Sequence, residues 1–122
     1  RIGSLRKDLD ALMKTEKTND PDRYERDVKN WYGRLRDTWE RAVEERLLKG
    51  VVERFAPGIQ TQKLKRLDIT PDLLLQIERG MTNSSQWLHD AAAGLNPKLP
   101  DTARAKKDLE DIDAFAAKCK AP

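Results

Sequence analysis

Apolar residues recur every three or four positions over most of the chain, which is the period of a helix that buries one face. The longest such run extends from about Asp20 to Lys49 and starts with a capping aspartate followed by a proline. Gly50 follows the run and can adopt the left-handed conformation that ends many helices. The pattern therefore predicts an all-α fold with one long central helix, of about 29 residues or about 43 Å, and several shorter helices packed on it.

A short helix is predicted before the central helix. Residues 5–16 carry apolar side chains at Leu5, Leu9, Leu12 and Met13; Leu9 is four residues after Leu5, and Leu12 and Met13 are three and four residues after Leu9, which puts them on one helical face. We interpret residues 1–18 as the end of a preceding helix or coiled coil, and residues 19–122 as a single helical domain. Because the chain starts at Arg1 and its first residues already have helical character, we expect it to be a C-terminal fragment of a larger protein.

Further helices are predicted in the second half of the chain. A Thr-Pro pair at 70–71 repeats the capping pattern and opens a helix that is expected to end at Gly80. Thr82 or Asn83 can cap the next helix, and Asp101 can cap the last one. The segment near 51–67 mixes alternating and helical spacing, so a short extended segment and a helix both remain open there.

The central helix and the terminal helix are both amphipathic, and neither can bury its apolar face alone. We therefore expect them to pack against each other. The buried stripe is predicted to consist of Leu35, Trp39 and Val43 on one side and Leu109, Ile112 and Phe115 on the other.

Composition restricts the functional classes. The net charge of +3 arises from 24 basic and 21 acidic residues that are interleaved along the chain, a pattern that does not favour general nucleic-acid binding. No apolar run approaches the roughly 18 residues of a membrane span. The single cysteine, Cys119, cannot form an internal disulfide, which fits a cytoplasmic protein. Its neighbours Lys118 and Lys120 could lower its pKa somewhat, but a thiol near the end of the chain is more often incidental than catalytic.

Few residues suggest catalysis. The sequence has no glycine-rich phosphate loop, metal-ligand cluster or serine elbow, so we expect no cofactor in this chain. Arg36 and Glu40 share a helix face beside the apolar stripe, where a guanidinium could hold a phosphate while the carboxylate takes a proton. Spacing alone favours an exposed ion pair, because the same spacing recurs in the chain, for example in Arg6–Asp10, Arg23–Asp27 and Arg41–Glu45. The only histidine is His89.

Three stretches of the chain resemble the C-terminal region of bacterial ABC/SMC-like AAA ATPases of the anticodon-nuclease type, which act in phage defence. These stretches are Tyr32–Glu45, Gly50–Phe55 and Met81–Asp90. In that family an N-terminal ATPase controls a C-terminal ribonuclease whose site contains an arginine, a glutamate four residues later and a downstream histidine. The resemblance therefore implies Arg36, Glu40 and His89 as catalytic residues.

The chemistry implied by the resemblance is metal-independent cleavage of RNA, with tRNA as the expected substrate. Glu40 or His89 would deprotonate a ribose 2′-OH, the other would protonate the leaving 5′ oxygen, and Arg36 would stabilise the charge on phosphorus. The alternative is a non-catalytic helical module of an SMC-like ATPase that binds a protein partner. Expected partners are RNA, the remainder of the ATPase chain and a second copy of this chain, but no membrane.

Overall fold

The computed structural model describes residues 2–52, 57–87 and 99–119 of the chain, and over these residues it is helical and contains no strand. The all-α prediction is therefore confirmed. The helical elements, in chain order, are α1 (Ile2–Glu16), α2 (Pro21–Ala42), the π-helical turn η1 (Val43–Leu47), the 3-10 helix η2 (Thr61–Arg66), α3 (Pro71–Ser85) and α4 (Thr102–Lys118).

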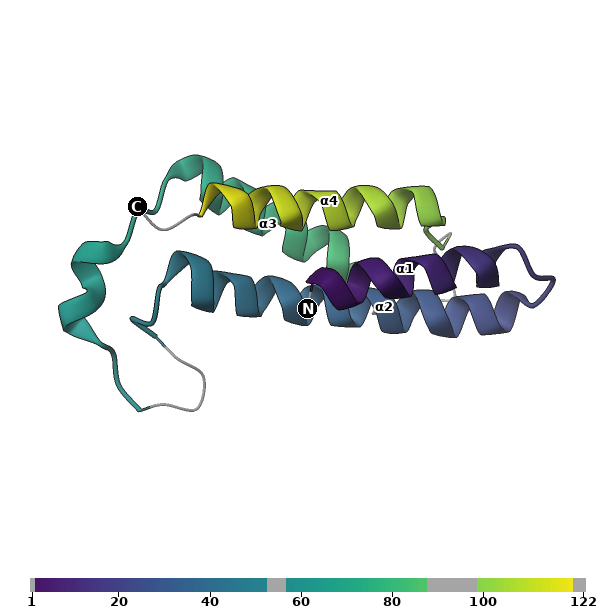
Figure 1. Cartoon of the computed structure of the whole chain (residues 1–122), viewed down its shortest axis with the longest axis horizontal. Coiled ribbons are helices and arrows are strands. Elements are labelled where there is room, and N and C mark those ends of the chain that lie inside the picture. The colour runs from purple at the N-terminus through teal and green to yellow at the C-terminus, as the bar shows by residue number, and fades with distance from the viewer. Residues whose placement is uncertain (1, 53–56, 88–98, 120–122) are drawn as a thin grey trace, which may run out of the picture.

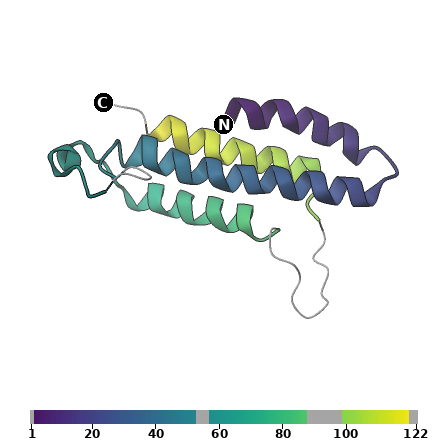
Figure 2. The ribbon, with the colours of Figure 1, turned by 90° about the horizontal axis from the view of Figure 1, so that it is seen from below.

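The α-helices form an up-and-down bundle (Figure 1 and Figure 2). Both α1 and α3 pack against α2 and also against α4, whereas α2 and α4 share a smaller contact across the bundle. The helices α2 and α3 run antiparallel, because Gly80 lies against Trp39 while Trp87 lies against Tyr32. Each helix thus contributes one face to a common core.

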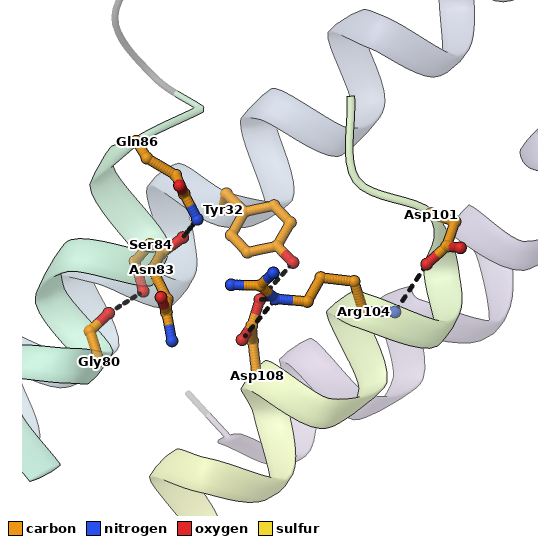
Figure 3. Close-up of polar contacts among 8 residues, drawn as sticks. All are labelled: Tyr32, Gly80, Asn83, Ser84, Gln86, Asp101, Arg104 and Asp108. Atoms are coloured by element: carbon orange, nitrogen blue, oxygen red, sulfur yellow. Dashed lines mark hydrogen bonds and ion pairs between the residues drawn. The ribbon is translucent and has the colours of Figure 1, made fainter. Parts of the chain in front are cut away.

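The predicted helix caps are present. The side chain of Asp20 accepts a hydrogen bond from the backbone N–H of Arg23 at 3.1 Å, and Thr70 accepts one from Leu73 at 3.2 Å. Asp101 caps α4 by accepting from the backbone N–H of Arg104 at 2.8 Å (Figure 3). These bonds satisfy backbone donors that have no partner within the first helical turn, so the cap residues define where the three helices start.

The central helix, α2 with η1, is continuous for 27 residues and ends two residues earlier than predicted. Its last turn widens, and the Leu48 N–H donates to the carbonyl of Val43 at 2.9 Å. The chain then leaves the helix through Lys49 and Gly50, whose φ angles are +48° and +87°. The glycine therefore takes the left-handed conformation that its position indicated.

The hydrophobic core contains side chains from all four α-helices, and the predicted contact between the central and terminal helices is confirmed. The rings of Trp39 and Phe115 have centroids 5.1 Å apart. Val43 is only partly buried at the edge of the core. The largest fully buried side chains are Trp39, Tyr32, Phe115, Leu5, Leu35, Ile112 and Val28.

Helix α1 shares this core with the later helices. Its residues Leu5, Leu9 and Leu12 are buried in the same cluster as the apolar residues of α2 and α4. Glu16, the last residue of α1, reaches the start of α4, where its carboxylate accepts hydrogen bonds from the backbone N–H and the hydroxyl of Thr102 at 2.9 and 2.6 Å. A carboxylate is favourable there because it faces the positive end of the helix dipole.

The prediction that a helix ends at Gly80 and another begins at Thr82 or Asn83 is wrong. Helix α3 runs without interruption to Ser85. Gly80 is buried inside it, and a Cβ atom at this position would lie 2.2 Å from two carbon atoms of the Trp39 ring. The glycine therefore allows close helix packing and is not a terminator. Residues 88–98, which include the predicted continuation of the second helix, lie outside the described residues.

The extended segment considered near 51–67 is not found among the described residues of this region. Residues 61–66 form η2, and the Gln60 N–H donates to the carbonyl of Val51 at 2.7 Å. In Figure 1 and Figure 2, η2 lies beyond the end of the bundle. Because η2 buries none of its side chains, no apolar face of this segment anchors it to the core.

Candidate functional site

The sequence-predicted residues Arg36 and Glu40 lie on the outer part of α2. Their side chains are 45% and 41% exposed, and the guanidinium nitrogen Nη2 lies 3.9 Å from the carboxylate oxygen Oε1. His89, the third residue of the predicted set, lies outside the described residues. The structure thus brings Arg36 and Glu40 together, as any helix does at this spacing, and the catalytic set stays a prediction.

The Arg36–Glu40 pair is one of several similar pairs on the same helical run. Pairs four residues apart also occur between Arg23 and Asp27, Lys29 and Glu25, and Arg41 and Glu45, at 3.8, 3.9 and 4.0 Å. Exposed pairs of this kind contribute at most about 1 kcal/mol to stability. The spacing alone does not decide the partner, because Arg6, four residues before Asp10, pairs with Asp113 of α4 at 2.9 Å.

A buried polar cluster that was not predicted joins α2 to α4 (Figure 3). Tyr32 donates a hydrogen bond of 2.5 Å to Asp108 Oδ2, and Arg104 Nε donates to both oxygens of the same carboxylate at 3.1 and 3.2 Å. Asp108 is only 3% exposed. The i,i+4 spacing of Arg104 and Asp108 was visible in the sequence, but no sequence signal linked either residue to Tyr32.

This cluster has the properties of a structural group. Burial raises the pKa of the Tyr32 phenol, and the hydrogen bond to Asp108 raises it further, so the phenol stays protonated and acts as a donor. Both oxygens of the carboxylate accept hydrogen bonds inside the protein. A buried carboxylate is tolerated only when such partners are present, and substitution of either partner lowers the stability of the protein because it leaves the carboxylate unsatisfied. The cluster therefore fixes the relative position of α2 and α4.

Two grooves of similar size lie on the bundle surface. One, with a volume of about 450 Å³, lies between α1 and α2, and the Arg34–Asp8 ion pair is part of its lining. The other, of about 460 Å³, lies between α3 and α4 over Trp39, and Lys118 and Asp72 pair at its end at 2.5 Å. In the described part of the chain, no three potential metal ligands (histidine, cysteine or carboxylate) lie close enough to hold a metal ion.

Cys119 is buried against the core at the end of α4. Burial raises the pKa of its thiol, and this effect outweighs the opposing influence of Lys49 and Arg46. The expectation that adjacent lysines lower the pKa is therefore wrong, because desolvation of the thiolate dominates at this position. A protonated, buried thiol is a poor nucleophile, which does not support a catalytic role.

The most distinctive surface feature is an accumulation of exposed apolar side chains at one end of the bundle. Among the described residues, every large hydrophobic side chain that is clearly exposed lies between positions 52 and 75. We call five of them the apolar end: Ile59, Leu64, Ile69, Leu74 and Leu75, which are 42–60% exposed. Leu64 belongs to η2, and Leu74 and Leu75 belong to the first turns of α3.

The sequence pattern left the segment near 51–67 open between an extended segment and a helix and predicted a helix from Thr70-Pro71 onward, but it did not predict that apolar residues of these segments are exposed. The signal that could have revealed the apolar end is the run Leu73-Leu74-Leu75, because consecutive residues of a helix point about 100° apart and cannot all face one core. Only Leu73 is buried.

None of the helices in the ranges that the structure describes combines the length and the apolar character needed to cross a bilayer. A comparison of the chain with protein-family models, with curated proteins and with solved structures gave no match.

Proposed function

We propose that this chain is a helical protein-interaction module, and that the apolar end is the surface through which it binds its partner. The supporting observation is the concentration of exposed large hydrophobic residues in one region: apart from Val52, which precedes it in the chain, no other large hydrophobic side chain of the described residues is as exposed. Soluble proteins seldom leave contiguous apolar surface uncovered unless it serves a contact. The partner implied by the family resemblance is the remainder of an SMC-like ATPase chain.

The position of η2 also supports this proposal. The element lies beyond the end of the bundle and buries none of its own side chains (Figure 1). A segment with so few internal contacts gains stability when a partner covers it, because each Å² of apolar surface removed from water contributes about 25 cal/mol. Binding through the apolar end would therefore stabilise η2.

Site-specific photo-crosslinking tests the proposal. A photoreactive amino acid at Leu64 or Leu74, in the protein expressed in its natural host, should give a discrete protein adduct. The matched control is the same group at Glu110, an exposed position on α4. Leu75→Asp should remove the adduct formed from Leu64 and leave the free energy of unfolding within about 0.5 kcal/mol, since the residue is exposed. Equal adducts from all three positions would contradict the proposal.

A second candidate is the metal-independent ribonuclease that uses Arg36, Glu40 and His89. It is favoured by one observation beyond the resemblance: the Trp87 ring packs on Tyr32 with a centroid distance of 6.3 Å. Tyr32 and Arg36 are one helical turn apart on α2. The end of α3 therefore approaches the face of α2 that carries the arginine.

Cleavage of RNA by the protein tests this candidate. Arg36→Ala, Glu40→Gln and His89→Ala should each reduce tRNA cleavage by about 10²–10⁴-fold, as expected for groups that move a proton or stabilise charge. Arg41→Ala is the control, because Arg41 belongs to an equivalent ion pair on the same helical run. The products should end in 2′,3′-cyclic phosphate, and DNA should not be cut. Undiminished cleavage by the triple variant would exclude this site.

A further inference from the structure

We propose that the apolar end binds an amphipathic helix of the partner protein, and that this helix carries acidic residues on the side that faces η2. The inference rests on the proposed interaction function and specifies the chemistry of the partner. It follows from three properties of the surface: the elements that form it, the charges around it and the acidic groups that interrupt it.

The elements of the surface favour a helical partner. Leu64 stands on η2 and Leu74 and Leu75 on α3, so the apolar side chains project from two helical elements that flank the segment 67–70. Binding of an extended strand requires an exposed sheet edge with free backbone groups, and the described residues contain no strand. A helix can instead place residues at i, i+3 and i+4 against both elements at once.

The charges of η2 favour acidic residues on that helix. Lys63, Lys65 and Arg66 surround Leu64, and within the described structure none of these three cations forms an ion pair. The nearby carboxylate of Asp72 is already paired with Lys118 at 2.5 Å. The apolar end is therefore bordered by unpaired positive charge, which carboxylates on a partner would neutralise.

The same surface is poorly suited to an anionic membrane. Glu78 lies one turn after Leu74 on the exposed side of α3, and Asp68 precedes Ile69. Carboxylates at these positions would meet the negative charge of lipid headgroups and reduce the attraction supplied by η2. A second copy of the chain that pairs η2 with η2 would place cation against cation, so it offers less electrostatic complementarity at η2 than an acidic helix.

Peptide binding measured by fluorescence anisotropy tests the inference. Two synthetic amphipathic helices of about 18 residues would be compared, with identical leucine stripes and with either glutamate or lysine at the flanking positions. The glutamate peptide should bind about tenfold more tightly, since two or three exposed ion pairs at the rim of the surface each increase the affinity modestly. This preference should decrease as salt is raised.

Two variants separate the contributions of charge and apolar contact. Charge reversal by Lys65→Glu and Arg66→Glu should invert the preference between the two peptides, and Leu74→Asp should abolish binding of both. The charge reversal Lys106→Glu on α4, at an exposed position away from the apolar end, serves as the control and should leave the preference unchanged.

Each of the other possible outcomes would overturn the acidic helical partner. Equal affinity for the two peptides would overturn the acidic partner, while crosslinks from Leu64 and Leu74 would still support the interaction module. Concentration-dependent dimerisation that Leu74→Asp abolishes, or binding to vesicles of anionic lipid that exceeds binding to the glutamate peptide, would overturn the inference in favour of a second copy or a membrane. Failure of both peptides to bind would also overturn it.

Discussion

Gly80 of α3 lies directly against the ring of Trp39 on α2. A Cβ atom on Gly80 would stand 2.2 Å from Trp39 Cε2 and Cζ2, far inside van der Waals contact. The indole is 1% exposed and also contacts Phe115 of α4, so it has little freedom to move aside. This one contact therefore connects three helices and sets the distance between α2 and α3.

Gly80→Ala should destabilise the protein, although alanine is the better helix former. Higher helix propensity contributes about 1 kcal/mol in favour of alanine, while an overpacked contact costs about 1–3 kcal/mol or more. We expect a net loss in the free energy of unfolding, measured by urea denaturation. Gly3→Ala in α1 is the control, because a Cβ there meets nothing within 4 Å. A stability gain in both variants would refute the contact.

A smaller ring at position 39 should relieve the clash. Trp39→Phe replaces the indole, of which three carbon atoms would lie within 2.8 Å of a Cβ on Gly80, by a smaller ring, so the cost of Gly80→Ala should be lower in the Trp39→Phe background than in the wild-type protein. A double-mutant cycle measures this coupling, which should lie between about 0.5 and 3 kcal/mol. Strict additivity of the two substitutions would show that Trp39 does not cause the strain.

Trp39→Ala should reduce the free energy of unfolding by about 3–5 kcal/mol, since it removes a large side chain from a closely packed core. The residue is 1% exposed, and its ring packs on Phe115. Thermal or urea denaturation followed by circular dichroism measures the loss. A decrease below about 1 kcal/mol would place Trp39 on a surface instead of in the core.

Tyr32→Phe should cost more than Tyr24→Phe. The Tyr32 hydroxyl donates to the buried carboxylate of Asp108, and hydrogen bonds to charged groups are worth about 1.5–3 kcal/mol. The Tyr24 hydroxyl donates mainly to the neutral carbonyl of Pro100 at 2.6 Å, and the Glu16 carboxylate lies at the longer distance of 3.5 Å, so about 1 kcal/mol is expected. Comparison of the two variants by urea denaturation tests the difference, and equal losses would show that the buried bond to Asp108 contributes no more than the bond to Pro100.

Stability should decline at high pH, and Tyr32 should account for part of the decline. Burial raises the pKa of Tyr32 in the folded protein above its value in the unfolded chain. The protonated phenol therefore contributes its full stabilisation below about pH 10, and this contribution is lost as the pH rises further. Each such tyrosine contributes a slope of up to about 1.4 kcal/mol per pH unit. Tyr32→Phe should therefore flatten the curve of unfolding free energy measured between about pH 9 and about pH 11.

Cys119 should react slowly with iodoacetamide in the folded protein. Its thiol is buried, and burial raises its pKa, so both access and the thiolate fraction are low. The alkylation rate, followed by mass spectrometry, should rise severalfold or more in denaturing urea. A native-state rate that matches the rate in urea would show that the end of α4 does not protect the thiol.

Local signals in the sequence were sufficient to predict much of the secondary structure. The caps at Asp20, Thr70 and Asp101 were found because a capping side chain acts on backbone groups only a few residues away. The central helix was predicted from its apolar period for the same reason, since residues three and four apart share a face of any helix, independently of the tertiary structure. The spacing of Arg36 and Glu40 is equally local, which is why it carries little information about a site.

Contacts between distant residues were decided only by the tertiary structure. Gly80 has the same sequence signature as a helix terminator, and its role became clear only when Trp39 was found to occupy the space of its missing side chain. Tyr32 and Asp108 are separated by 76 positions, so no local pattern could predict their hydrogen bond. The exposure of Leu74 and Leu75 likewise depends on which faces the other helices cover. Burial is a property of the whole fold, whereas helix formation is largely a property of neighbouring residues.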